Sequence, residues 1–183
     1  MTVVAVETFF AILALVAIAS VVGAAALRLA AVVSRSARRR WDGLARAVGP
    51  NAYAMAWFVA FLATAGSLYF SEVAGFEPCR LCWYQRIAMY PLVPILAVGS
   101  WKRDPNVRFY ALPPAVVGLG VSIWHYLLET FPSLEGSSSC SIDVPCSAKY
   151  VNEFGFVSIP FMAGCGFLLI IALMTFTLRK ETT

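Results

Sequence analysis

The sequence predicts an all-α integral membrane protein, a four-helix transmembrane bundle with one extra N-terminal transmembrane helix. Two observations support this fold class. The chain of 183 residues is 60% hydrophobic and only 13% charged, and its mean hydropathy of +0.76 is too high for an ordinary soluble domain. Five apolar stretches are also long enough to cross a hydrocarbon core of about 30 Å, which takes about 20 helical residues. Only helices fit, because backbone polar groups in lipid must be bonded within their own segment.

The five predicted spans divide the chain into an added N-terminal part and a core. Residues 1–50 hold the extra span and a basic cytoplasmic loop, and residues 51–180 hold the four-helix core, within one membrane domain of residues 1–183. Pro91 and Pro94 predict a kink in the third span, because proline lacks the N–H of a helix interior. The predicted spans are Val3–Val33, Ala52–Glu72, Leu81–Trp101, Phe109–Phe131 and Phe156–Leu178.

The basic residues predict the orientation of the chain. Of the 14 lysines and arginines, 11 fall on one side of the predicted spans, and loops rich in such residues are normally cytoplasmic. This places the N-terminus outside and the C-terminus in the cytoplasm of a multi-pass plasma-membrane protein. Basic residues beside apolar runs indicate membrane loops next to lipid and not a nucleic-acid surface. The 11 residues are Arg28, Arg35, Arg38, Arg39, Arg40, Arg46, Lys102, Arg103, Arg108, Arg179 and Lys180.

Four of the five cysteines fall on the outer side as two pairs. Cys79 and Cys82 stand where the third span begins, and Cys140 and Cys146 stand in the outer loop, in "CSIDVPC". In an oxidising compartment such pairs are commonly structural disulfides. Closing loops this small contributes only about 2 kcal/mol in the chain-entropy model, so a redox role is the stronger interpretation. Cys165 lies within the fifth span among small residues and is predicted to be an inert buried thiol.

The residues around the first pair fit a redox centre at the membrane boundary. A thiol at a helix N-terminus has a lowered pKa, because the positive end of the helix dipole favours the thiolate. Arg86 lies four residues beyond Cys82 on the same helix face, and His125 in the fourth span can reach the same depth. Alone, Arg86 could snorkel to the headgroups and His125 could be an interhelical hydrogen-bond partner. Together, beside a thiol pair, they indicate a lipid-soluble acceptor of electrons and protons such as a quinone.

With these residues in place, the sequence resembles the DsbB/BdbC family of membrane disulfide-bond formation proteins over about residues 52 to 178. The most specific motif is "CRLCWYQR", a C-x-x-C followed by the aromatic Tyr84 and by Arg86. A second motif is "HYLLETFPS", which puts His125 at the family's histidine position. The third is the paired-cysteine loop leading into "GFVSIPF". The short spacing of that loop is more like the BdbC branch.

The resemblance implies a membrane thiol oxidase that works as an electron relay. Cys140 and Cys146 would take electrons from an extracytoplasmic thioredoxin-fold partner like DsbA or BdbD, with Cys140 forming the mixed disulfide. Cys146 would exchange with Cys79, and the Cys82 thiolate would face a quinone, either ubiquinone or menaquinone. The resemblance thus implies four catalytic residues, three quinone-binding residues and no metal site. The catalytic residues are Cys79, Cys82, Cys140 and Cys146, and the quinone-binding residues are Cys82, Arg86 and His125.

Two departures and two alternatives accompany this interpretation. The first span is additional to the four of the family, and it puts the N-terminus outside, where the family has it inside. Gln85 occupies a position where some members carry an acid. An enzyme of the vitamin-K-epoxide-reductase type also pairs thiols with a quinone, but there the active C-x-x-C follows the shuttle cysteines. A non-enzymatic protein whose four outer cysteines hold a structural zinc is the other alternative. Zinc leaves Arg86 and His125 at membrane depth unexplained.

Overall fold

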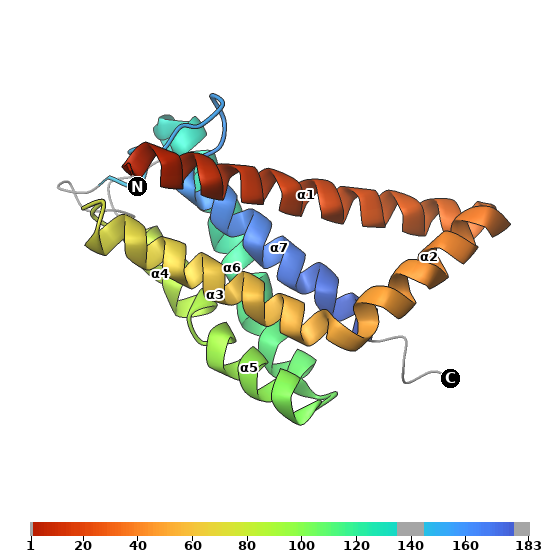
Figure 1. The fold of residues 1–183 in the computed structure, drawn as a ribbon. Helices are drawn as coiled ribbons and strands as arrows, with labels where there is room; N and C mark the ends of the chain where they lie inside the picture. Colours follow the sequence, from red (N-terminus) through yellow and green to blue (C-terminus); the bar gives the residue numbers. More distant parts are fainter. Residues whose placement is uncertain (1, 135–144, 178–183) are drawn as a thin grey trace.

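The computed structural model describes residues 2–134 and 145–177, and this part of the chain is a bundle of long helices (Figure 1). Five helical segments are long and apolar enough to cross a membrane, which confirms the predicted fold class. The main helices are α1 (Val3–Val33), α2 (Arg35–Val48), α3 (Ala52–Glu72), α4 (Arg80–Met89), α5 (Leu92–Lys102), α6 (Val107–Thr130) and α7 (Ile159–Thr177). Two short 3-10 turns, η1 (Gly49–Asn51) and η2 (Pro132–Leu134), complete the described elements.

The helix bounds follow the predicted spans closely. α1 and α3 have the predicted bounds, and the third predicted span is formed by α4 and α5, with Pro91 as the N-cap residue of α5. The predicted kink is therefore confirmed. α7 begins at Ile159, three residues later than the sequence predicts. The reason is a turn before it, in which Phe154 and Gly155 have φ values of 54° and 80°, a left-handed conformation that no helix can continue through.

The basic segment after α1, which the sequence predicts as a loop, forms the helix α2. Ser34 separates the two helices, and its side chain accepts a hydrogen bond from the backbone N of Ala37 at 3.5 Å, which caps the start of α2. Trp41 stacks on Phe176 of α7 at 5.1 Å, while the guanidinium of Arg28 lies 5.3 Å from the centre of the Trp41 ring. α2 thus returns the chain from the far end of α1 to the end of α7 (Figure 1).

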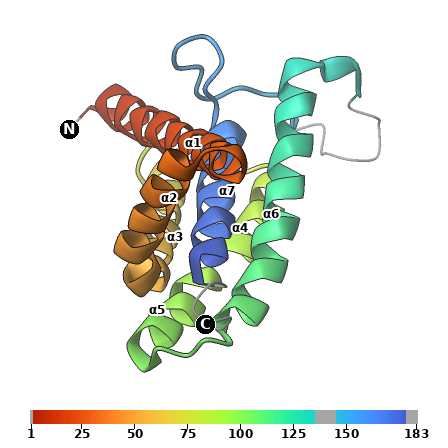
Figure 2. The same cartoon turned by 90° about the vertical axis from the view of Figure 1, so that its right-hand side faces the viewer.

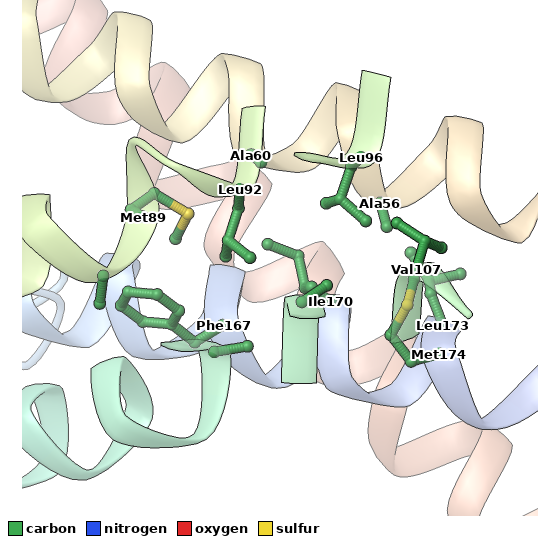
Figure 3. Close-up of a cluster of buried hydrophobic side chains, with 13 residues drawn as sticks. Ala56, Ala60, Met89, Leu92, Leu96, Val107, Phe167, Ile170, Leu173 and Met174 are labelled. Atoms are coloured by element: carbon green, nitrogen blue, oxygen red, sulfur yellow. The ribbon is translucent and has the colours of Figure 1, made fainter. Parts of the chain in front are cut away.

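The main core lies where α3, α4, α5 and α6 meet α7, which runs through the middle of the bundle (Figures 2 and 3). Lipid tails are as apolar as leucine, so close van der Waals packing and not the hydrophobic effect holds such helices together. Small residues permit this packing. A Cβ at Gly118 of α6 would collide with the ring of Phe167, which is fully buried. The largest members of the core are Leu92, Leu96, Phe167, Ile170 and Met174.

α1 packs along α7 and closes one side of the bundle. Ala14 and Ala17 form a small buried cluster with Cys165 of α7, so the thiol lies at a close helix contact, as the sequence predicts. In Figure 1 the N-terminal end of α1 lies at the same end of the molecule as the end of α6 and the start of α7. The residue that caps the start of α4, Cys79, contacts His125 near the end of α6. This end of the bundle contains the candidate active site.

Candidate active site

The first cysteine pair occupies the start of α4. Cys79 is the N-cap residue, with an extended backbone (φ −68°, ψ 173°), and its Sγ accepts a hydrogen bond from the backbone N of Cys82 at 3.4 Å. The sulfur takes the place that a serine or aspartate oxygen fills at other helix starts. Both cysteines are free thiols with their sulfurs 3.1 Å apart. Because a disulfide is about 2.05 Å long, only a small movement separates this pair from its oxidised form.

The pKa of Cys79 is lowered from its ordinary value of 9.0 to about 4. The main cause is the hydrogen bond from the Cys82 side chain, which stabilises the thiolate. Burial of Cys79 opposes this effect, and the hydrogen bond and charge of His125 add to it. A thiolate is the reactive form of cysteine in disulfide exchange, so the surroundings of Cys79 favour that chemistry at neutral pH.

Gln85 sets the orientation and tautomer of His125. The Nε2 group of Gln85 donates to Nδ1 of His125 at 3.1 Å, which leaves the histidine hydrogen on Nε2. That nitrogen lies 3.1 Å from the carbonyl oxygen of Cys146 and 3.6 Å from Sγ of Cys79. His125 is only 2% exposed. The histidine therefore connects the start of α4 with the cysteine loop, and an amide, not an acid, holds it in place.

Arg86 is buried inside the bundle and does not reach outward to the headgroups. It is 9% exposed, and its Nε and Nη2 donate to Oγ and the backbone oxygen of Ser67, each at 3.1 Å. Its guanidinium also lies 5.2 Å from the centre of the Trp83 ring. The Tyr90 hydroxyl donates to the same Ser67 Oγ at 3.3 Å. The snorkelling alternative for Arg86 is thus excluded by the contacts it makes with α3.

Cys146 lies beside the first pair. It is fully buried in a small cluster with Cys79, Leu81 and Leu128, and its sulfur is in a disulfide. Cys140, which the sequence places in the same loop, lies outside the described residues. Of the two sequence-predicted cysteine pairs, the structure therefore places three members, and these three lie together around His125.

A cavity of about 320 Å³ borders the other side of the first pair. This volume is within the range of small-molecule sites. Its walls come from α1, α3, α4 and α7 and are mostly apolar, and Cys82, Gln85 and Arg86 contribute polar groups. Cys79 and His125 are not among the described residues that line it. Of the two residues that the sequence predicts to lie around one ligand, Arg86 lines this cavity, and His125 contacts it through Gln85.

Glu129 is a buried acid that the sequence analysis does not single out. It lies one helical turn beyond His125 on α6 and is 6% exposed. Its Oε2 has no hydrogen-bond partner among the described residues, and its charge is within reach of His125, Lys149 and Cys79. Periodicity along α6 could have found it, because residues four apart on a helix share a face.

The zinc alternative needs four cysteines, and the structure describes three of them. Among the described residues, Cys79, Cys82 and His125 have ligand atoms gathered within 4.8 Å of one another. Cys146 is near them, but its sulfur is in a disulfide and a structural zinc site uses thiolates. The geometry therefore fits thiol chemistry better than a closed metal centre.

Comparison with known proteins places this arrangement in a family. The model of the family "Disulfide bond formation protein DsbB" matches residues 50–177. "Disulfide bond formation protein C" of Bacillus subtilis is 52% identical over 118 residues, which are 64% of this chain and 86% of that relative. "Probable disulfide formation protein" of Oceanobacillus iheyensis is 48% identical over 132 residues, 72% of this chain and 91% of that relative. No solved structure matches the chain significantly.

The fold and the site define a multi-pass helical membrane protein with a thiol pair at the start of one span. The match over residues 50–177 and the identities of these relatives make the assignment specific. The chain belongs to the DsbB family of disulfide bond formation proteins, as the sequence predicts. Family membership makes it an oxidoreductase of membrane disulfide formation.

We expect Cys79 to remain a thiolate in the reduced protein down to a pH of about 4, because its pKa is lowered to that value. The ultraviolet absorbance of the thiolate, followed while the pH falls, measures this. Cys82→Ala removes the largest stabilising hydrogen bond and should move the titration to higher pH, and His125→Ala should do so less. Cys165→Ala is the control and should leave this titration unchanged. A wild-type titration near pH 9.0, the ordinary thiol value, would contradict the prediction.

Proposed function

We propose that this chain is a quinone-dependent thiol:disulfide oxidoreductase that reoxidises an extracytoplasmic thioredoxin-fold dithiol protein. One observation supports this proposal above others. Cys79 lies against Cys146, while Cys82, one helical turn away, lines the cavity. The Cys79–Cys82 pair therefore stands between a disulfide-bearing loop and a site for an apolar ligand, which is the order that an electron relay needs.

The first half of the proposed reaction is thiol–disulfide exchange. A partner thiolate attacks Cys140 of the oxidised loop and forms a mixed disulfide, and the second partner thiol resolves it. The partner leaves with a disulfide, and Cys140 and Cys146 become thiols. Cys146 then attacks Cys79 of the oxidised first pair, Cys82 leaves as a thiolate, and Cys140 attacks Cys146 to release Cys79. Each exchange forms one S–S bond and breaks another, so two electrons move inward without an external oxidant.

The second half returns the first pair to its disulfide. Cys79, as a thiolate, and Cys82, as a thiol, would give up two electrons and one proton when their disulfide re-forms. A bound quinone would supply the two-electron acceptor, and water would supply the second proton needed for a quinol. Arg86 supports this step, because its fixed positive charge lies within electrostatic reach of Cys82. A guanidinium beside the cavity can stabilise both the thiolate and negative charge that develops on a quinone oxygen. The cavity volume and apolar walls suit either ubiquinone or menaquinone.

His125 is assigned to the exchange half of the reaction. Its Nε2 faces both the Cys79 sulfur and the Cys146 carbonyl, so it can hold the Cys79 thiolate as exchange with Cys146 begins. Gln85 keeps the hydrogen of His125 on that side. The expectation that His125 also borders the quinone stays a prediction, since Gln85, which holds its ring, lines the cavity while His125 itself is not among the described cavity residues.

The function is tested by anaerobic reduction of ubiquinone and menaquinone analogues. Purified protein, supplied with a reduced thioredoxin-fold partner, should convert quinone to quinol in a one-to-one ratio with partner disulfide. Cys146→Ser should abolish this turnover but leave quinone binding intact, because Cys146 acts before the quinone. Cys165→Ala, with its thiol in the α1–α7 contact, should leave turnover unchanged. Stoichiometric zinc in the purified protein with no quinone reduction would instead favour the metal-binding alternative.

Arg86→Ala should lower quinone reduction without slowing exchange between the cysteine pairs. Removing one donor to a developing oxyanion typically lowers a rate by about 10² to 10³. Because the guanidinium already shares its donors with Ser67, we expect the low end of that range. Arg86→Lys should recover only part, since a point charge does not reproduce the planar fork. Arg80→Ala, at an exposed arginine of the same helix, is the matched control. Wild-type quinone kinetics in Arg86→Ala would leave Arg86 with a structural role only.

We also propose that the cysteine end of the bundle is extracytoplasmic, with the N-terminus outside, in the plasma membrane. The support is the uneven distribution of basic residues, with the exposed arginines of α2 at the opposite end from the site. A membrane-impermeant thiol reagent applied to whole cells should label a Glu77→Cys variant and leave an Arg39→Cys variant unlabelled, in a background that lacks the native cysteines. The reverse pattern would overturn the proposed orientation.

A further inference from the structure

α1 lies outside the part of the chain that the family model matches, yet it forms a wall of the cavity beside Cys82. The family model matches residues 50–177, and the match to the Bacillus subtilis relative takes up 86% of that protein. That relative therefore has no room for a counterpart of all of residues 1–49. In this chain α1 contributes six residues to the cavity wall, which are Phe10, Leu13, Ala14, Val16, Ala17 and Ser20.

Near the cysteine end, α1 and α3 are in direct contact. The ring of Phe10 lies over Gly66, where a Cβ would come within 2.6 Å of the ring. The same ring meets Phe70 edge-on at a centroid distance of 5.8 Å. Gly66 precedes Ser67, which holds Arg86. The aromatic contact is thus part of the cavity wall next to Ser67, and only glycine at position 66 permits so close an approach.

Farther along, α1 and α3 move apart, and the cavity reaches the surface between them. Figure 1 shows the two helices diverging from the N-terminal end of α1 toward α2, which joins their wide end. Val16 of α1 and Phe58 of α3 both line the cavity, although they are 58% and 53% exposed. Gln85 and Arg86, by contrast, are buried. Val16 and Phe58 lie within helices long and apolar enough to span a membrane, so in a bilayer an opening between them would face hydrocarbon.

We propose that α1 and α3 form a lateral entrance through which the quinone ring reaches Cys82 and Arg86 from the bilayer. The isoprenoid tail then lies between Val16 and Phe58, and Phe10 over Gly66 limits how far the ring travels. This inference rests on the proposed quinone function. It makes α1, the segment outside the family match, a determinant of which quinones the site accepts.

The apolar character of the entrance favours an isoprenoid tail as its occupant. Cys82, Gln85 and Arg86 of α4 are neighbours in the cavity wall, whereas five of the six lining residues of α1 are apolar, Ser20 being the exception. A quinone has the same division, with a polar ring and a hydrocarbon tail. A phospholipid acyl chain also fits the apolar part, but its headgroup would be drawn into the low-dielectric interior, which is costly for a charged group.

The entrance is tested by narrowing it with tryptophan at two positions, each with a matched control. Val16→Trp and Phe58→Trp add bulk to cavity-lining residues, while Ile12→Trp and Phe61→Trp add it at exposed residues of the same helices that do not line the cavity. The readouts are kcat/KM for a quinone with a long isoprenoid tail, kcat/KM for a tailless analogue, and the rate of exchange with the reduced partner.

We expect both cavity variants to lower kcat/KM for the long-tailed quinone by about tenfold or more, with a smaller loss for the tailless analogue. Exchange with the partner should be unchanged, which also shows that the variants fold. The two control variants should match wild type with every substrate. Equal kinetics of cavity and control variants with the long-tailed quinone would overturn the entrance, as would an equal loss for both quinones, which would indicate a distorted ring site. If wild-type protein reduces no quinone at all, the proposed function itself fails, and this outcome is distinct from the others.

Discussion

The two sulfurs of the C-x-x-C motif belong to one helix start but face different surroundings, and the whole site depends on this separation. Cys79 precedes the first helical residue and has an extended backbone, so its side chain leaves the helix surface and reaches His125 and the loop of Cys146. Cys82 has already entered α4, and its side chain faces the cavity. A pair placed one turn farther into the helix would lose the N-cap geometry, and with it the hydrogen bond from the Cys82 backbone N to the Cys79 sulfur, the smallest of the interactions that lower the pKa of Cys79.

The hydrogen bonds of the buried polar side chains follow from the cost of placing such groups in a bilayer. A charged or polar side chain at this depth is costly unless a partner meets it. Arg86 therefore uses both the side chain and the backbone of Ser67, and His125 uses both ring nitrogens. The hydrogen bonding of Glu129 is less complete, since its Oε2 has no hydrogen-bond partner among the described residues. Its position one helical turn from His125 keeps a second titratable side chain within electrostatic reach of Cys79.

The spans and the redox-active residue types could be predicted from the sequence because both depend on local patterns. Apolar length gave the bounds of α1 and α3, Pro91 gave the break between α4 and α5, and the C-x-x-C spacing indicated a helix start. Contacts between distant segments could not be predicted in the same way. Nothing local to Ser67 shows that it meets Arg86, because this contact depends on how α3 packs against α4.

The placement of His125 is a second contact between distant segments that local sequence patterns could not predict. Its position in α6 lets its ring meet Cys79, but position along a helix alone does not say which other side chains the ring contacts. Gln85 decides this, by binding the ring from α4. The helical character of α2 was also not predicted, because a high density of arginine resembles a solvated loop. In the structure, Ser34 caps the segment and Trp41 attaches it to α7.

The hydrogen bonds of Arg86 to Ser67 also make the walls of the cavity differ in what a displacement would cost. They fix α3 against α4 both in rotation and in axial position, because either motion would leave a buried guanidinium without its acceptors. α1 meets α7 chiefly through apolar contacts, such as those of its alanines with Cys165. Displacing α1 would therefore cost packing and leave the guanidinium of Arg86 with its acceptors, whereas displacing α3 or α4 would strand a buried charge. The added helix and the family core thus differ in the kind of interaction that holds them in place.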